Sequence, residues 1–397
     1  MPTITIVSNG HGEDVIGASL ARSVLSMAPA VAVRAFPLVD EGAPYRAAAV
    51  ERLGPCRAMP SGGLTVHSLT NFLGDVRAGF MGMTLAQIAE LTRLRSDAVV
   101  VVGDIYAQVL ATFTRARFRA VVQPLVSAYH RAGAGAPRPN RYFMERISYP
   151  ERALMRHLAA VVYARDDATA AWLRARGVGH AMALGNPMVD LARGRPVEGA
   201  PAGVTLALLP GTRAHTPAAL ARMAEALALL PGVTGLVAWQ GGALPALDGW
   251  EEDGSAPPTA GRTTALRRGA SRLWVLEGRF GDVLASARVA LGTAGTGNEQ
   301  AAALGVPVVS FPVEPGYGQT FLENQRRLLG DALTVTTPDP VDVAAAARRL
   351  LADEAAWGRA ARAGTERMGG PGGSEAIARD LLLRLRRLVP AFDAAVR

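Results

Sequence analysis

The sequence predicts two doubly wound α/β domains in tandem, and three observations support this prediction. Short runs rich in Val, Ile, Leu and Ala alternate with helical patterns along the whole chain. These runs are apolar at successive positions, which is typical of parallel strands covered by helices on both faces. The chain has 397 residues, more than two domains of about 150 residues each require.

The same alternation fills both halves of the chain. In the first half we predict strands near residues 3–7, 31–36, 98–102, 120–123 and 160–163. Helices are predicted between them near 17–27, 85–94, 106–115 and 168–176. In the second half we predict strands near 205–209, 235–239, 273–276, 289–291 and 306–311. The accompanying helices are predicted near 217–230, 299–304, 321–329, 341–351 and 375–388. This alternation favours two Rossmann-like units.

Glycine and proline concentrate between residues 185 and 203, which indicates an interdomain connection. We therefore predict an N-terminal domain at 1–190, a C-terminal domain at 200–372 and a C-terminal helix at 373–397 that packs back on the N-terminal domain. Ligands of open α/β sheets bind beyond the carboxyl ends of the strands. Two such domains are therefore expected to face a cleft.

All 42 basic residues are arginines, so the chain contains no lysine. This excludes a phosphate-binding lysine of the Walker type and Schiff-base chemistry, including that of pyridoxal phosphate. A bound phosphate would be held by backbone N–H groups, hydroxyls, helix N-termini or arginines. The net charge of +8 suits an anionic partner. A bias toward arginine codons is the alternative explanation of the excess.

Composition also limits the class of protein. Cys56 is the only cysteine, which excludes disulfide scaffolds and cysteine-based zinc sites. No stretch reaches 18 uninterrupted apolar residues, and the N-terminus lacks the features of a signal peptide. We therefore expect a soluble cytoplasmic protein.

The segment 289–312 runs from a strand through a loop of small residues into a helix. Its loop contains Thr293, Gly295, Thr296, Gly297 and Asn298. Small residues let a ligand approach the backbone, and a helix N-terminus supplies N–H groups and a positive dipole end, so the segment suits a diphosphate. Glu299 is expected to open the helix and to accept hydrogen bonds from vicinal sugar hydroxyls. The alternative is a tight turn in which Glu299 serves the helix dipole.

Two further junctions place polar residues after a predicted strand. Gly211, Thr212 and Arg213 follow the strand at 205–209, at its carboxyl end. His11 and Asp14 follow the first strand, where unpaired polar groups would be costly to bury. His11 is a candidate general base or phosphate contact. The alternatives are a solvent-facing loop for His11 and a helix-capping role for Glu13 and Asp14.

Four ordered motifs resemble the lipid-A-disaccharide synthase group, and especially its "lipid-A-disaccharide synthase-related" relatives. Leu209-Pro-Gly-Thr-Arg resembles L-P-G-S-R, and residues 293–307 resemble S-G-T-A-T-L-E-A-A-L-x-G-x-P. Asp14-Val-Ile-Gly-Ala and Gly185-Asn-Pro-Met-Val-Asp resemble D-x-x-G-A and G-x-P-x-x-D. Residues 305–324 are similar to the lipid II N-acetylglucosaminyltransferase of peptidoglycan synthesis, with Gln319 and Asn324 in place of its Q-x-x-x-N element.

The resemblance implies a GT-B glycosyltransferase that moves a sugar, with inversion, from a UDP-sugar to a lipid acceptor. It implies that Thr293, Gly295, Thr296 and Gly297 hold the diphosphate, that Arg213 neutralises it and that Glu299 holds the ribose. Gln319 and Asn324 would bind donor-sugar hydroxyls. The group's D-x-P-D-F-N stretch falls on residues 102–108, which makes Asp104 the candidate general base and His11 its rival.

An Asp-x-Asp motif is absent from the sequence, so we expect no metal and no cofactor beyond the UDP-sugar donor. Residues 64–94 combine aromatics and methionines with glycines, which suits contact with an anionic membrane at the cytoplasmic face. The alternative is an ordinary buried loop and helix. No nucleic-acid partner is expected, and no oligomeric state is assigned. The rival functions are a UDP-sugar epimerase or hydrolase on the same fold and a non-catalytic nucleotide-sugar-binding protein.

Overall fold

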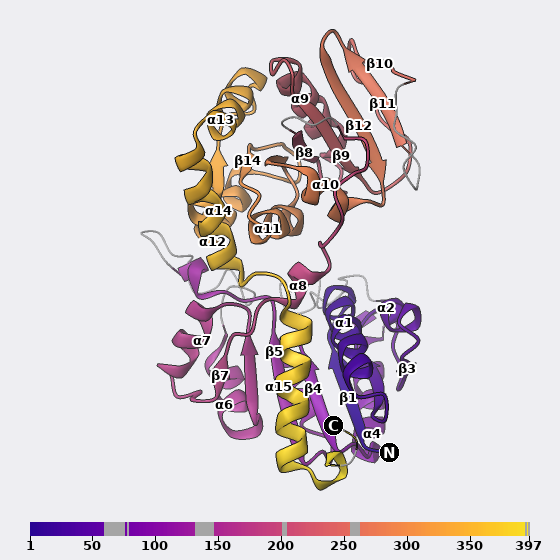
Figure 1. Ribbon diagram of the computed structural model, residues 1–397. Coiled ribbons are helices and arrows are strands. Elements are labelled where there is room, and N and C mark those ends of the chain that lie inside the picture. The colour runs from indigo at the N-terminus through magenta and orange to yellow at the C-terminus, as the bar shows by residue number, and fades with distance from the viewer. Residues whose placement is uncertain are drawn as a thin grey trace. The chain divides into compact units, whose positions relative to one another are not determined.

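The computed structural model divides the chain into two compact units (Figure 1). It describes residues 1–58, 76–77, 79–131, 147–200, 205–254, 263–393 and 395. The first unit comprises Met1–Met188 together with Gly372–Arg397, and the second comprises Val189–Pro371. Among these residues, no helix is both long and apolar enough to cross a membrane.

The first unit contains a seven-stranded sheet of order β3-β2-β1-β4-β5-β6-β7. Its strands are β1 (Thr3–Ser8), β2 (Ala32–Pro37), β3 (Glu51–Arg52), β4 (Ala98–Val102), β5 (Phe118–Gln123), β6 (Val161–Ala164) and β7 (Ala181–Met182). Every neighbouring pair is parallel. All five residues of β4 are buried, which explains its continuous apolar run. The predicted parallel sheet is confirmed.

Helices cover the sheet of the first unit on both faces. They are α1 (His11–Met27), α2 (Ala43–Ala47), α4 (Phe80–Arg93), α5 (Ile105–Ala111), α6 (Tyr149–Leu158), α7 (Asp167–Arg174) and α15 (Gly373–Leu388), while the short α8 (Pro187–Asp190) leads into the second unit. Helices α4 to α7 share one hydrophobic cluster through side chains such as Leu91, Leu110, Met155 and Leu173. Helix α15 packs beside α1, where the hydroxyl oxygens of Ser19 and Ser374 are 3.0 Å apart (Figure 1).

The second unit contains an eight-stranded sheet of order β10-β11-β12-β9-β8-β13-β14-β15. Its strands are β8 (Thr205–Leu209), β9 (Thr234–Trp239), β10 (Glu251–Glu252), β11 (Thr263–Arg268), β12 (Ser271–Glu277), β13 (Val289–Gly292), β14 (Val308–Ser310) and β15 (Leu333–Val335). The β10/β11 and β11/β12 pairs are antiparallel and the others are parallel. The sequence analysis missed this antiparallel edge because only Ala265 and Leu266 of β11 are buried.

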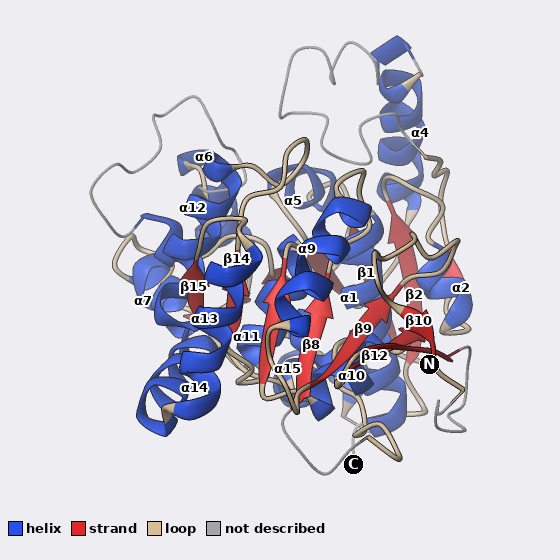
Figure 2. Ribbon diagram, turned by 90° about the horizontal axis from the view of Figure 1, so that it is seen from above, coloured by secondary structure: helices blue, strands red, loops and turns tan. Residues whose placement is uncertain are grey.

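In the described part of the second unit, six helices accompany the sheet. They are α9 (Thr216–Ala228), α10 (Phe280–Ser286), α11 (Gly295–Ala303), α12 (Gln319–Leu329), α13 (Pro340–Ala352) and α14 (Glu354–Met368). Leu220 of α9 and Val343 of α13 belong to one core cluster with side chains of β8, β9 and β13. Figure 2 shows α9 against β8 and α13 beside β14.

Several helices begin earlier than the sequence predicts, among them α1 and α11, which carry candidate site residues. Helix α1 begins at His11 instead of residue 17, and α11 begins at Gly295 instead of Glu299. Gly10 has a φ of 143°, which lets the chain turn from β1 directly into α1. His11 and Asp14 therefore lie in the first turn of α1, and Glu299 does not open α11 as predicted.

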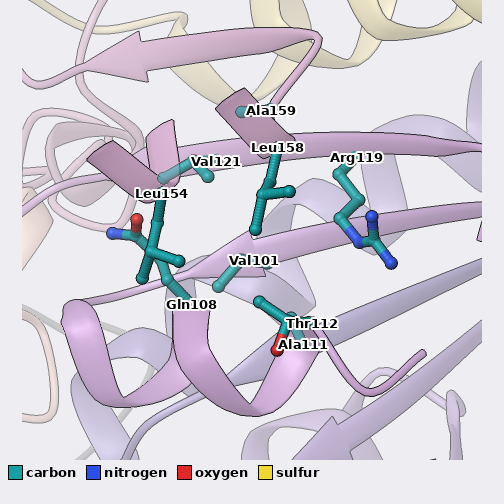
Figure 3. A pocket seen from close by; sticks show the side chains of 9 residues that line it. All are labelled: Val101, Gln108, Ala111, Thr112, Arg119, Val121, Leu154, Leu158 and Ala159. Carbon is teal, nitrogen blue, oxygen red and sulfur yellow. The ribbon is translucent and has the colours of Figure 1, made fainter. Parts of the chain in front are cut away.

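A small apolar cavity of about 20 Å³ lies between α5, α6 and the strands β4 and β5. Figure 3 shows Leu154 and Leu158 of this cavity near Val101 and Thr112, with the Arg119 side chain at the other end. A cavity of this size admits about one water molecule.

Candidate functional site

The loops that follow β8 and β13 are joined by three hydrogen bonds. The two strands are neighbours, and Leu209 pairs with Gly292 at their carboxyl ends. The Thr293 amide donates to the Leu209 carbonyl at 3.0 Å, and the Thr293 hydroxyl donates to the Pro210 carbonyl at 3.0 Å. The Nε2 atom of buried His215 is 3.0 Å from the Thr293 carbonyl oxygen, so Nε2–H is the donor. These bonds hold the two loops side by side.

The junction brings Gly211 next to the start of α11, since a Cβ atom on Gly211 would lie 3.8 Å from the Ala294 Cα atom. The helix's hydrogen-bond ladder begins with the Asn298 amide, which donates to the Ala294 carbonyl at 2.9 Å. The amides of residues 295–297 therefore precede the ladder and lie at the positive end of the helix dipole. Thr296 and Arg213 are both exposed at this junction. The arrangement can bind an anion without lysine.

Two predicted donor-binding residues support the junction from inside. The Thr293 side chain is 0 % exposed, and its hydroxyl already donates to Pro210. Asn298 is also fully buried, and its Nδ2 atom lies 3.2 Å from the Gly292 carbonyl oxygen and 2.9 Å from the Tyr317 hydroxyl. Both side chains are directed into the interior and hold the junction together, and contact of Thr293 and Asn298 with a donor stays a prediction.

Gln325 and Phe321 also hold the start of α11, and the sequence analysis did not identify them. Gln325 Nε2 donates to the Gly295 carbonyl at 2.7 Å, and its Oε1 accepts from the Tyr317 hydroxyl at 3.0 Å. A Cβ atom on Gly295 would lie 2.9 Å from the Phe321 ring. Gly295 is therefore needed for close packing. The sequence feature that could have pointed to Gln325 is its position directly after Asn324, which was already a candidate.

Gln319 and Asn324, the residues predicted to bind the donor sugar, both lie on α12. Gln319 is its exposed first residue, and Asn324 is half-buried. Five residues of α-helix correspond to a rotation of about 140°. The two side chains therefore project from different faces of the helix and are not brought together by it.

Glu299 and Gln300 lie one turn inside α11 and are both half-buried. On the helix they lie on either side of the exposed Thr296. Burial raises the pKa of Tyr317 to about 12, and the Glu299 carboxylate adds to this shift, which places Glu299 near Tyr317. A carboxylate and an amide therefore flank the exposed edge of the helix start.

The first unit places His11 and Asp14 in different environments. His11 is 67 % exposed, and its Nδ1 atom lies 3.4 Å from the Asp40 carboxylate. Asp14 is fully buried and accepts a 2.6 Å hydrogen bond from the Ser8 hydroxyl, which is also 2.8 Å from the Tyr45 hydroxyl. Burial raises the pKa of Asp14 to about 7. The Asp14 carboxyl therefore lies in the interior, bonded to Ser8, and its catalytic role stays a prediction.

Asp104 lies where β4 ends and α5 begins. Its Oδ1 atom accepts from the Tyr106 amide at 3.0 Å, so it caps the helix, and from Asn9 Nδ2 at 3.1 Å. Asn9 follows β1, the neighbour of β4 in the sheet. The half-buried Asp104 carboxylate is thus fixed at the carboxyl edge of the sheet, as the sequence predicts for this position.

Two glutamates to which the sequence analysis assigned no catalytic role, Glu13 and Glu151, lie near Asp104. Glu151 is buried, and its Oε1 atom accepts from Gln108 Nε2 at 3.0 Å and from Gln123 Nε2 at 2.8 Å. Burial and the Asp104 charge raise the pKa of Glu151 to about 7, and the same two causes raise that of Glu13 to about 7. Within the described ranges, no cluster of three or more His, Cys, Asp or Glu side chains is arranged to hold a metal ion.

The chain's overall structure is similar to solved proteins of one fold. The calicheamicin glycosyltransferase CalG4 is 16% identical with a TM-score of 0.62, and the match covers 98% of this chain and 100% of that chain. Acinetobacter baumannii MurG is 12% identical (TM-score 0.57, 97% and 100% covered). The Neisseria meningitidis UDP-GlcNAc 2-epimerase bound to UDP-GlcNAc is 12% identical (TM-score 0.55, 97% and 100% covered). No protein-family model and no curated protein matches the sequence.

These similarities define the class of fold. The chain has the GT-B fold, which glycosyltransferases and UDP-GlcNAc 2-epimerases share. The predicted fold class is confirmed. The same fold carries more than one reaction, so the function has to be argued from the site residues.

Proposed function

We propose that this protein is an inverting, metal-independent glycosyltransferase that moves a sugar from a UDP-sugar to a lipid acceptor at the inner face of the cytoplasmic membrane. The observation that carries the proposal is the junction of residues 211–213 with the start of α11. This junction combines helix N–H groups with an arginine, as a diphosphate requires when lysine is absent.

On the donor side, the amides of residues 295–297 and the Arg213 guanidinium bind the diphosphate. Glu299 accepts hydrogen bonds from the ribose hydroxyls, as the resemblance implies, and Gln300 is the alternative because it flanks the same helix edge. Gln319 and Asn324 remain the proposed contacts to the donor sugar. Negative charge grows on the diphosphate as the glycosidic bond breaks, so Arg213 stabilises the transition state more than the ground state.

On the acceptor side, Asp104 takes the proton of the attacking hydroxyl. The hydrogen bonds from Asn9 and the Tyr106 amide fix its Oδ1 atom. The acceptor oxygen then forms the new bond to the anomeric carbon, and the electron pair of the broken bond leaves with UDP. His11, which Asp40 orients from 3.4 Å, is the rival base.

The predicted membrane contact at 64–94 lies partly outside the described residues, which exclude 64–75 and 78. In α4, Phe80 and Met83 are buried, while Met81 is 51% and Leu85 is 65% exposed. A hollow of about 370 Å³ beside the helix is lined by Pro55, Cys56, Arg57, Gly79, Gly82 and Met83. We propose that the exposed side of α4 contacts the lipid acceptor.

The test is incubation of the protein with a panel of UDP-sugars and a total lipid extract. A labelled glycolipid of inverted anomeric configuration is the expected product. Release of free UDP or an epimerised UDP-sugar without a glycolipid would contradict the transferase. Binding without turnover would indicate a nucleotide-sugar-binding protein.

The acidic group around Asp104 favours a second candidate, a UDP-sugar epimerase or hydrolase. Burial and the Asp104 charge raise the pKa of Glu13 and of Glu151 to about 7, so protonated and ionised carboxyl groups both occur near Asp104 at neutral pH. Such a group suits proton transfer on the donor sugar itself. Exchange of solvent deuterium into the sugar of a recovered UDP-sugar would favour the epimerase over the transferase.

A further inference from the structure

The outer surface of α6 and α7 carries arginines stacked on aromatic rings. The guanidinium carbon of Arg152 lies 5.8 Å from the centre of the Tyr149 ring and 5.3 Å from that of Trp172. The guanidinium carbon of Arg176 lies 4.3 Å from the centre of the same indole ring. Both distances to Trp172 are within the range of a cation–π interaction. Figure 1 shows the two helices at the β7 end of the sheet.

A third arginine is fixed beside this stack. Arg156 Nη2 donates to the Arg176 carbonyl at 2.6 Å. Gly177 has a φ of 87°, and a Cβ atom on it would lie 2.5 Å from Arg156 Nη2. Arg156 therefore lies directly on the turn after α7. We call Tyr149, Arg152, Arg156, Trp172 and Arg176 the α6–α7 arginine surface.

Among the described residues, the positive charge of the surface is not paired with a carboxylate. None of its three arginines forms an ion pair with another residue that the structure describes. The neighbouring acid, Glu151, is buried and bonded to Gln108 and Gln123. Burial and the charges of Arg176 and Arg156 lower the pKa of Arg152, while the charge of Glu151 acts in the opposite direction and raises it. The three guanidinium groups therefore repel one another. A polyanionic partner would relieve this repulsion.

Exposed apolar side chains accompany the charges. Tyr149 is 71% exposed, and Leu158 at the end of α6 is also exposed. Helices α4 and α5 share the core of this layer and expose Met81, Leu85 and Val109, and Phe113 is exposed just after α5. Arginines with tyrosine, tryptophan and aliphatic side chains suit a membrane interface, where phosphates lie next to acyl chains. A nucleic acid would meet the charges and the rings but not the aliphatic groups.

We propose that the α6–α7 arginine surface binds the anionic phospholipid head groups of a bilayer. Tyr149 lies two residues before Glu151, which is close to Asp104, so the surface begins beside the proposed acceptor site. Binding there brings Asp104 to a membrane-borne acceptor. The choice of a membrane partner rests on the proposed function, in which the acceptor is a lipid.

The test measures binding of the whole protein to vesicles of phosphatidylcholine alone or mixed with phosphatidylglycerol. The wild type is expected to bind the mixed vesicles selectively, and less at high salt. The double variant Arg152→Gln/Arg176→Gln should bind about 30-fold more weakly, because each arginine near an anionic surface contributes about fivefold. The matched control Arg359→Gln/Arg362→Gln removes two exposed arginines of α14 and should bind like the wild type.

A third variant, Tyr149→Ser, keeps the charge and should still bind less tightly, so the test stands even if the double variant misfolds. Equal binding to neutral vesicles, or equal losses in the double variant and its control, would overturn the proposal. Tighter binding to single-stranded RNA than to vesicles, lost in the double variant, would overturn the membrane assignment. Calorimetry with UDP separates the two proposals. If the protein binds the mixed vesicles but does not bind UDP, only the proposed function is contradicted.

Discussion

The hydroxyl of Thr293 donates a 3.0 Å hydrogen bond to the carbonyl oxygen of Pro210 and thereby joins the two loops of the donor side. The bond is fully buried, and the same residue accepts from His215 through its own carbonyl oxygen. Thr293 therefore holds the loop after β8 against the segment that leads into α11.

Thr293→Val should lower stability and weaken UDP binding together. The valine keeps the volume but leaves the Pro210 carbonyl without this donor, which costs about 1–3 kcal/mol in a buried site. Urea unfolding and calorimetry with UDP measure the two effects. Thr296→Val, at an exposed position three residues on, should leave stability unchanged. Equal stability of the two variants would contradict the supporting role of Thr293.

Glu299→Ala should weaken UDP binding by one to two powers of ten. Two ribose hydroxyls would lose an ionised acceptor, and a hydrogen bond to a charged group contributes about 1.5–3 kcal/mol. Calorimetry on Glu299→Ala and Gln300→Ala compares the two side chains that flank Thr296. A loss confined to Gln300→Ala would transfer the ribose contact to Gln300, and no loss in either would remove α11 from the ribose site.

Arg213→Ala should lower kcat more than it weakens donor binding. The guanidinium is exposed at the loop after β8, where it meets charge that grows as the bond to UDP breaks. Steady-state kinetics with varied UDP-sugar separates kcat from KM. Arg222→Ala, a change of equal charge on α9, is the control. A rise in KM with an unchanged kcat would assign Arg213 to ground-state binding alone.

The fold was predictable from the sequence because its central strands are buried on both faces. The predicted strands at 98–102 and 205–209 coincide with β4 and β8. The helix starts at His11 and Gly295 were placed too late, since glycine has a low helix propensity. Gly10 instead lets the chain turn into α1. Gly295 instead allows the close approach of the Phe321 ring.

The site was predictable only in part. Residues that follow a strand in sequence, such as Arg213 and Asp104, are visible because parallel strands end at one edge. Glu151 was missed because its position near Asp104 depends on tertiary packing of α6. Thr293 and Asn298 stand in the right segment, yet their burial is decided by contacts with Pro210 and Tyr317, which the sequence does not reveal.

Asp104→Asn should reduce turnover about 10²–10⁴-fold and leave UDP binding intact. Asparagine keeps the helix cap and the shape but removes the basic oxygen. His11→Ala tests the rival base, whose side chain is exposed and paired with Asp40. Single-turnover rates with saturating donor compare the two variants. Near-normal turnover in Asp104→Asn together with a large loss in His11→Ala would reverse the assignment.

Glu151→Gln should make the protein more stable at pH 8 and change little at pH 4. The pKa of Glu151 rises from 4.5 to about 7 on folding because the carboxyl is buried near Asp104. Between these two values the folded state holds more protons than the unfolded state, so stability falls as pH rises through this window. The fall amounts to about 3 kcal/mol for a shift of this size. Glutamine keeps the Oε1 acceptor for Gln108 and Gln123 but carries no charge, so the variant should lose this part of the pH dependence.

Urea unfolding at pH 4 and pH 8 measures the difference in stability between Glu151→Gln and the wild type. The control is Glu375→Gln, at an exposed position of the same unit. A variant that is less stable than the wild type at pH 8 would show that Glu151 is ionised and stabilising in the folded protein.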